Sequence, residues 1–324
     1  IIYRLVITMY YRNILLALCF AGGMHSAKAA NDSQILQEQL DVCYAKKGIC
    51  IIDLHGAKKV LTKTLKIDPE LVTIRDAVFE CRMNDGSCLY ISEEGYGHKN
   101  DATINKLENI TLFGNKSIDG ITMNYSVPRD YVTNAALTLS SVAIQGFNHG
   151  LVIGNGVWGI DMFNVIIGGG NIGIFVPPGT KNSGERSTFF GGAIYNNAIV
   201  GLDEESSIEL DFQGTSFDYN NQQMILNGPT DFTGHLENSE NKKPEIVLNA
   251  LPGVAAGSLY MSAGSTITVN GWNPKAPKQP CYVETKVSWS NVKLPATVYG
   301  FGGTIGGICG PGKVVTWDGK DPKF

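Results

Sequence analysis

The sequence predicts an all-β protein built as a right-handed parallel β-helix, a solenoid in which each turn of the chain stacks on the one before. Three observations support this prediction: an apolar pattern that recurs, the length of its period, and the short polar or glycine steps inside it. The pattern recurs after 23 positions and again 50 positions later. Its three copies are Leu137, Leu139, Val142, Ile144, Leu151 and Ile153; Ile160, Met162, Val165, Ile167, Ile174 and Val176; and Leu210, Phe212, Thr215, Phe217, Met224 and Leu226.

Each copy reads as three short strands. The apolar residues form i, i+2 pairs, the period of a strand whose alternate side chains face a core. About 23 to 25 residues per turn is too short for a propeller blade and typical of a solenoid. Successive turns, from about residue 48 to about residue 250, should stack at about 4.8 Å, with Ile144, Ile167 and Phe217 in one inward column.

One further turn, with an inserted loop, is expected between the second and third copies. An offset of 28 residues from Ile160 continues the first two strands through Thr188, Phe190, Ala193 and Tyr195. This alignment makes Tyr195 a core residue. The loop 177–186 accounts for the additional residues, and insertions in solenoids collect on one face, often the binding face.

The N-terminal segment has the pattern of a secretory signal peptide. Arg12 precedes an apolar run from Ile14 to Gly23, and Ala27-Lys28-Ala29 follows. We expect residues 1–29 to be the signal peptide, with translation starting at Met9, which would leave Ile1–Thr8 untranslated. The apolar run is too short to span a bilayer as a stable helix. The mature protein is therefore expected to be secreted or periplasmic, without a membrane span.

Six of the seven cysteines remain after this cleavage. An even number in a secreted chain favours disulfides, although six cysteines allow 15 connectivities that the sequence does not distinguish. We predict local pairing as Cys43–Cys50, Cys81–Cys88 and Cys281–Cys309. Neither a Cys-x-x-Cys motif nor paired histidine spacing is present, so no metal and no cofactor is expected.

The length and net charge of the chain limit its domain organisation and its binding partners. The roughly 295 mature residues suit one elongated solenoid. We assign residues 30–250 to the β-helix with its N-terminal cap, and residues 251–324 to a small C-terminal β-rich cap or appendage, because the repeat fades after about Pro252. The net charge of -4 with scattered Lys and Arg gives no basic stripe. Nucleic acid is therefore not an expected partner.

An amphipathic helix is expected before the first strand. Ser33 is a candidate N-cap, and the apolar residues that follow it are Ile35, Leu36, Leu40 and Val42. Such a helix can cover the open end of a β-helix, where unpaired strand edges would otherwise associate.

The order of segments here resembles the entry segment of pectin-lyase-like β-helix proteins, including phage tailspike-type glycan depolymerases. That order is the helix, Gly48, the apolar strand 49–52, the turn Asp53-Leu54-His55-Gly56 and the strand Thr64-Leu65-Lys66-Ile67. The resemblance runs from about Ser33 to about Asn249. The stretches 182–186, 214–220 and 234–238 are similar to turns of secreted and phage-associated glycan-processing β-helices.

The resemblance implies a polysaccharide-processing protein that meets extracellular polysaccharide. A homotrimer is possible by analogy with tailspikes, and the sequence leaves the oligomeric state open.

Candidate catalytic residues follow from aligning the turns. One position is shared by Gln145, Gly168, Asn196 and Asp218, which directly follow the inward residues Ile144, Ile167, Tyr195 and Phe217. Glu237 follows Leu236 in the same way. Asp218 and Glu237 should therefore be neighbours on one outer face, with backbones about 5 Å apart. Two such carboxylates can supply the acid and the nucleophile or base of glycoside hydrolysis.

Two further residues are candidates to support this chemistry. His235 lies two residues before Glu237 and could orient a carboxylate or transfer a proton. Glu185 lies in the inserted loop, which could lean over the same face and contribute an acid. The structural alternative is that these are ordinary surface residues, because Asp and Asn are common in turns and exposed ion pairs contribute little.

Sugar contacts are expected from aromatic and polar side chains near the same face. Aromatic faces pack against the apolar faces of sugars, which makes Tyr219 and Trp158 candidate stacking platforms. Asn196 and Arg186 are candidate polar contacts.

Two functional classes remain open. The first is an enzyme, a hydrolase or a lyase, that cuts extracellular polysaccharide at the Asp218/Glu237 face. The second is a non-catalytic secreted β-helix that binds glycan or acts as a surface adhesin. No adjacent Asp-Asp pair or Gly-His-Gly turn is present, which argues against a polygalacturonase; the nearest sequence is Asn148-His149-Gly150. The acidic run Asp203-Glu204-Glu205 is expected to form a solvated turn.

Overall fold

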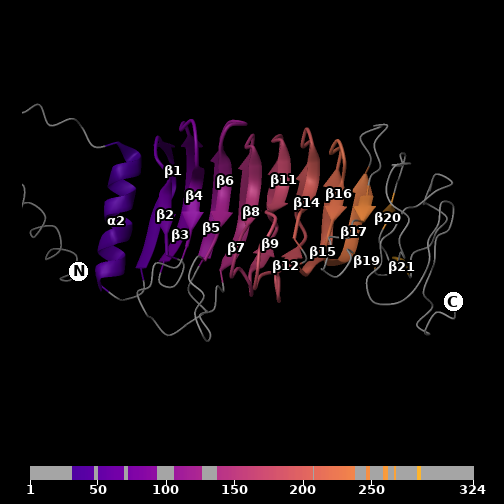
Figure 1. Ribbon diagram of the computed structural model, residues 1–324. Helices are drawn as coiled ribbons and strands as arrows, with labels where there is room; N and C mark the ends of the chain where they lie inside the picture. The colour runs from indigo at the N-terminus through magenta and orange to yellow at the C-terminus, as the bar shows by residue number, and fades with distance from the viewer. Residues whose placement is uncertain are drawn as a thin grey trace, which may run out of the picture. The chain divides into compact units, whose positions relative to one another are not determined.

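The computed structural model describes residues 31–46, 50–68, 72–92, 106–125, 137–206, 208–237, 246–248, 258–261, 266–267 and 283–285. The predicted signal peptide lies outside the described residues, as does most of the predicted C-terminal segment. The described elements are one helix, α2 (Asp32–Lys46), and a long series of strands (Figure 1).

The strands form two sheets, and the described strand pairs are parallel. The larger sheet contains β1 (Cys50–Leu61), β3 (Val72–Cys81), β5 (Lys106–Phe113), β7 (Thr138–Gln145), β9 (Asp161–Phe163), β10 (Ile166–Gly168), β12 (Thr188–Phe190), β13 (Ala193–Tyr195), β15 (Leu210–Asp218), β17 (Pro229–Glu237), β19 (Ser258–Met261), β20 (Thr266–Ile267) and β21 (Val283–Thr285). The smaller sheet contains β2 (Leu65–Ile67), β4 (Ser87–Ile91), β6 (Asp119–Met123), β8 (His149–Ile153), β11 (Ile172–Val176), β14 (Val200–Glu204), β16 (Met224–Leu226) and β18 (Ile246–Leu248).

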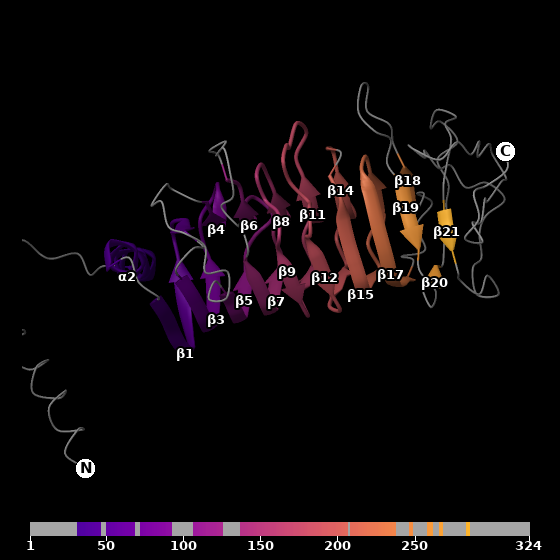
Figure 2. The same ribbon diagram turned by 90° about the horizontal axis from the view of Figure 1, so that it is seen from below.

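The chain passes from the larger sheet to the smaller sheet and back once per turn, so each strand pairs with the equivalent strand of the next turn (Figure 2). This topology is a right-handed parallel β-helix, the hand that connections between parallel strands adopt. The predicted fold class is confirmed. Parallel pairing continues through β19 and β21. Among the described residues, no helix is both long and apolar enough to cross a membrane.

The larger sheet has two arms, because a left-handed residue interrupts its strands. In β7 this residue is Ser141, with φ of +54°, and its equivalents are Asn109 in β5 and Asn164 between β9 and β10. Short polar residues tolerate this conformation better than most. The first arm precedes the interruption and includes β9 and β12; the second arm follows it and includes β10 and β13. The two arms and the smaller sheet are the three strands that the repeat predicted.

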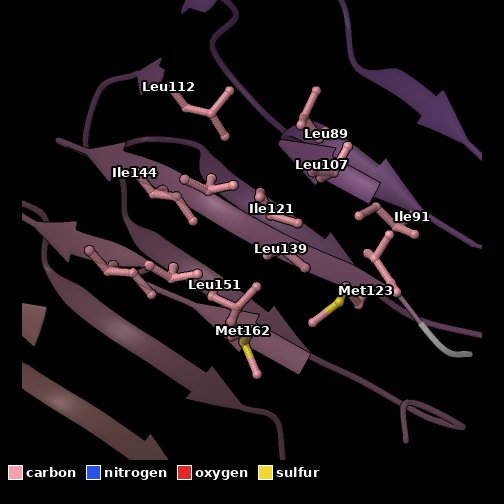
Figure 3. Packing of buried hydrophobic residues seen from close by; sticks show 14 of the residues in the cluster. Leu89, Ile91, Leu107, Leu112, Ile121, Met123, Leu139, Ile144, Leu151 and Met162 are labelled. Atoms are coloured by element: carbon pink, nitrogen blue, oxygen red, sulfur yellow. The ribbon is translucent and has the colours of Figure 1, made fainter. Parts of the chain in front are cut away.

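The core lies between the two sheets. The register pairs Ile144 with Ile167, Ile167 with Ile194 and Ile194 with Phe217, and all four side chains are buried. The predicted inward column is therefore confirmed. Figure 3 shows Leu139 and Met162 of the larger sheet beside Leu151 of the smaller sheet.

The alignment of the extra turn was wrong by one residue. Phe189 pairs with Met162 and Ile194 pairs with Ile167, an offset of 27 rather than 28. Because side chains alternate between the faces of a strand, a slip of one residue exchanges inside and outside. Phe189 and Ile194 are therefore the buried residues of this turn, and Tyr195 is on the outer face.

Helix α2 closes the N-terminal end of the solenoid, as predicted. The first turn has no preceding strand to accept its backbone N–H groups, and side chains of α2 accept them instead. Asp32 accepts from Val60 at 2.9 Å, and the Ser33 hydroxyl oxygen accepts from Thr62 at 2.8 Å. Gln37 accepts from Lys66 at 2.9 Å.

The helix begins differently from the prediction. Asn31, not Ser33, caps it, with Asn31 Oδ1 accepting from the Gln34 N–H at 3.0 Å. Leu36 and Leu40 are buried, whereas Ile35 and Val42 are exposed.

Two of the three predicted disulfides are present. Cys43 is bonded to Cys50 and Cys81 to Cys88, with Cα–Cα distances of 5.6 and 5.7 Å. The third predicted pair, Cys281–Cys309, lies outside the described residues. The two bonds are local, each closing a short stretch of chain at the N-terminal end of the solenoid.

Candidate functional site

The outward residues at the end of the second arm form one column across the turns. The register pairs Gln145 with Gly168, Gly168 with Tyr195, Tyr195 with Asp218, and Asp218 with Glu237. Asp218 and Glu237 are thus partners on the adjacent parallel strands β15 and β17, whose backbones are about 4.8 Å apart. The backbone relationship matches the sequence prediction, while the Glu237 side chain lies outside the described structure.

Asp218 is held by its own strand. It is half-buried, and its Oδ1 accepts a hydrogen bond of 2.5 Å from the Ser216 hydroxyl. Ser216 is in turn the register partner of His235, which is exposed. The predicted residues Asp218 and His235 are therefore brought to one outer face, with Ser216 between them.

Tyr195 belongs to this column, and the sequence alignment had placed Asn196 there. The ring lies across Gly168: a Cβ added to Gly168 would be 2.6 Å from ring atom Cε1. Gln145 Nε2 donates a hydrogen bond of 3.2 Å to the Tyr195 hydroxyl. Glycine at position 168 makes room for the ring, and Gln145 fixes its far end. The result is a half-buried aromatic surface over Gly168, on the side of Tyr195 that is away from Asp218.

Asn196 and Tyr219 lie one residue further on, at the corner after the second arm. Their φ values are +53° and +57°, and the equivalent residues in earlier turns are Gly146 and Gly169, also left-handed. Asn196 tolerates this conformation, but a bulky residue rarely adopts it. Tyr219 is 49% exposed. Tyrosine at this corner is therefore not explained by backbone preference.

The structure does not bring Glu185, Arg186 and Trp158 to this column. The inserted loop stacks on the loop of the preceding turn, where the Gly159 N–H donates to the Glu185 carbonyl at 2.8 Å. Both loops connect the smaller sheet to the first arm. Strand β12 of the first arm thus intervenes between Glu185 and the second arm, where Asp218 lies. Glu185 and Arg186 are exposed, and Trp158 is half-buried.

Sequence reasoning missed a polar cluster on the outer face of the smaller sheet. His149 Nδ1 lies 2.8 Å from Asp119 Oδ1, and the His149 ring stacks on Phe175 with centroids 4.4 Å apart. Phe175 is the register partner of Asp203. Burial raises the pKa of the Asp203 carboxyl to about 6, with Glu205 adding to the rise and His149 opposing it. The sequence signal that could have found this cluster is that its residues occupy outward positions on successive strands of the smaller sheet.

The acidic run 203–205 is not a solvated turn, which corrects the prediction. Asp203 and Glu204 end strand β14, and Glu204 has an exposed fraction of 0%. Its carboxylate accepts backbone hydrogen bonds from Ile208 at 2.9 Å and Gly228 at 2.8 Å. Burial raises the pKa of Glu204 to about 8, against the lowering effect of the backbone donors. The prediction was wrong because the sequence does not distinguish two kinds of acidic residue. A glutamate that accepts backbone N–H groups in the interior and a glutamate in a surface turn occur in similar acidic runs.

Within the described ranges, no group of three or more His, Cys, Asp or Glu side chains is placed to hold a metal ion. The chemistry available at the second arm is that of carboxylates, an imidazole and phenol groups. These groups can transfer protons, act as nucleophiles, and bind hydroxyl-rich ligands.

No protein-family model matches this chain, and no curated protein sequence matches it. Among solved structures, the chain is similar to the A-module of mannuronan C-5 epimerase AlgE4 from Azotobacter vinelandii, with 14% sequence identity and a TM-score of 0.42. The match covers 86% of this chain and 96% of that chain. Independently of this similarity, the strand topology defines the class of the molecule as a parallel β-helix protein.

Proposed function

We propose that this protein processes extracellular polysaccharide and cleaves glycosidic bonds at the outer face of the second arm. Asp218 and Glu237 are the acid/base or nucleophile pair in this proposal. The observation that carries it is the parallel register of these residues on β15 and β17. Two carboxyl groups on adjacent strands can act on opposite sides of one glycosidic bond, one as the acid and the other as the nucleophile or base.

Neighbouring side chains give the pair its supporting groups. The Ser216 hydroxyl fixes one oxygen of Asp218, which limits the orientations of the carboxylate. His235, the register partner of Ser216, is on the same outer face as the pair, and its role in this proposal is to exchange protons with the pair. The Tyr195 ring, lying over Gly168, offers a flat face for a sugar unit further along the same column from Asp218.

Two disulfides support a location outside the cytoplasm. Disulfides persist in oxidising compartments and are rare in reducing ones. Cys43–Cys50 and Cys81–Cys88 therefore agree with secretion or export to a periplasm, where a polysaccharide substrate would be met.

A panel of neutral and acidic polysaccharides tests the proposal. Release of reducing ends measures any cleavage, and absorbance of unsaturated products distinguishes a lyase from a hydrolase. We expect cleavage of at least one polymer, and loss of that cleavage in Asp218→Asn. Glu209→Gln is the matched control, because Glu209 is an exposed acid directly before β15. Glu185→Gln tests whether the inserted loop takes part, and we expect it to cleave at the parent rate.

A second candidate is glycan binding without turnover. The fixed ring of Tyr195 favours it, since an immobilised aromatic side chain loses little conformational entropy on binding. Binding of a polymer that is not cleaved, weakened by Tyr195→Ala, would identify the protein as a binder.

A further inference from the structure

The outer face of the first arm carries a pair of stacked phenylalanines. Phe163 on β9 and Phe190 on β12 are register partners, and their ring centroids are 4.9 Å apart with planes 9° from parallel. Phe163 is 42% exposed. The core does not need these rings, because the adjacent residues Met162 and Phe189 are the buried ones.

The stack has one open end. The rings stack in the direction that runs from strand to strand, so one face of Phe163 is covered by Phe190 and the other is turned toward β7. The residue of β7 in register with Phe163 is Ser140, whose side chain is too small to cover a phenyl ring. An apolar ring face therefore stands beside a small polar residue on an outer surface.

One acidic residue, Asp161, borders this ring face, because it is exposed and lies two residues before Phe163 on the same strand. Its outward column continues through Thr188 to Asp211, which lies beyond Phe190 on β15. Asp211 Oδ2 accepts hydrogen bonds from Gln213 Nε2 at 2.7 Å and from Thr188 Oγ1 at 3.4 Å. Carboxylates accept strong hydrogen bonds from hydroxyl groups and repel other carboxylates.

We propose that this surface is a second glycan-binding site, which takes a pyranose residue without a carboxylate group. The C–H face of the sugar packs on the open face of Phe163 over Ser140, and sugar hydroxyls donate to Asp161. Aromatic rings pack against apolar faces of this kind, and the Asp161 carboxylate repels uronic acids. This inference rests on the proposed function only for the class of ligand, a glycan. It adds a second place where the protein contacts such a ligand.

The test is binding, measured by calorimetry in the Asp218→Asn variant so that cleavage does not interfere. The probes are cellohexaose, maltohexaose, chitohexaose and hexagalacturonate. We expect at least one uncharged hexasaccharide to bind, Phe163→Ala to weaken its binding by about 10-fold, and hexagalacturonate not to bind at this site. Phe113→Ala is the matched control, because Phe113 is also 42% exposed and on the larger sheet, but on the second arm.

A second variant blocks the site without removing the stack. Ser140→Phe places a third ring on the open face of Phe163, and aromatic residues are well tolerated in strands. It should abolish binding, while Ser140→Thr should retain it, and thermal unfolding should show both variants folded.

Three results would overturn the proposal. The first is that no uncharged probe binds, or that binding is unchanged in both Phe163→Ala and Ser140→Phe. The second is that hexagalacturonate binds in a Phe163-dependent manner. The third is that sedimentation shows Phe163→Ala dissociating an oligomer, which would make a second copy of the chain the occupant. If the protein does not cleave polysaccharide, binding at Phe163 can still be observed. Failure of the proposed cleavage is therefore distinguishable from failure of the proposed binding site.

Discussion

The carboxylate of Glu204 accepts the backbone N–H of Gly228, 2.8 Å away on the next turn, although no part of Glu204 is exposed. At the corner that follows the smaller sheet, the buried carboxyl group of Glu204 therefore takes the place of a backbone carbonyl as hydrogen-bond acceptor. Gly228 is required there, since a Cβ would lie 2.3 Å from Glu204 Oε1.

We predict that Glu204→Gln lowers the free energy of unfolding by about 1–3 kcal/mol at about pH 4, where the cost of ionising the buried Glu204 does not enter. Both oxygens of Glu204 accept backbone N–H groups, and the amide of glutamine would direct its own donors at one of them. Urea unfolding measures the change, with Glu205→Gln as the control expected within about 0.5 kcal/mol of the parent. Equal stability of Glu204→Gln and the parent would show that this carboxylate does not hold the corner.

Asp203 should make stability depend on pH. Its pKa is raised to about 6 by burial, so the folded state retains the proton more strongly than the unfolded state, whose pKa is about 3.9. The associated stability is present below about pH 4 and is lost as the pH rises through about 6. Asp203→Asn lacks this titration.

The parent should therefore lose more unfolding free energy than Asp203→Asn between pH 4 and pH 7.5, by on the order of 1 kcal/mol. Glu204 titrates in both proteins, which leaves the difference to Asp203. Parallel pH profiles for the two proteins would contradict the raised pKa.

Tyr219→Gly should leave the protein at least as stable as the parent. Tyr219 has a φ of +57° at a corner where two earlier turns have glycine, and a left-handed conformation costs a bulky residue about 1–2 kcal/mol. Urea unfolding checks this, with Asn196→Gly as a comparison expected to change less. A loss of more than about 1 kcal/mol would show that contacts of the Tyr219 side chain outweigh the strain.

Peptide mapping under non-reducing conditions should recover three local disulfides. Cys43–Cys50 and Cys81–Cys88 are seen in the structure, and Cys281–Cys309 remains a prediction. Replacing both Cys81 and Cys88 by Ser should cost about 2 kcal/mol, the loop-closure entropy of a short loop. Detection of free thiols at Cys281 and Cys309 would contradict the predicted third disulfide.

The repeat predicted the core because the inward column is determined by period alone. Ile144, Ile167 and Phe217 lie at fixed spacings, and the residues between them alternate regularly. The predicted register of the turn with the inserted loop was wrong because two adjacent residues are apolar in each of its strands, Phe189-Phe190 in one and Ile194-Tyr195 in the other. The sequence then offers two registers, and only packing selects one.

The site was predictable only in part, for the same reason. Asp218 and Glu237 end regular strands, so their backbone pairing could be derived. The contact of Asp119 with His149 joins the adjacent strands β6 and β8 of the smaller sheet, where short strands and variable loops hide the register. The burial of Glu204 depends on backbone donors at positions 208 and 228, which no local pattern indicates.

The double variant Asp218→Asn, Glu237→Gln tests the central claim most directly. Amides preserve the shape of both side chains but remove their ionised oxygens, so cleavage of a polysaccharide cut by the parent should fall by at least about 100-fold. Folding should change by less than about 0.5 kcal/mol, as is usual for outer positions. Cleavage at the parent rate would contradict the account and make Asp218 and Glu237 ordinary strand-end carboxylates.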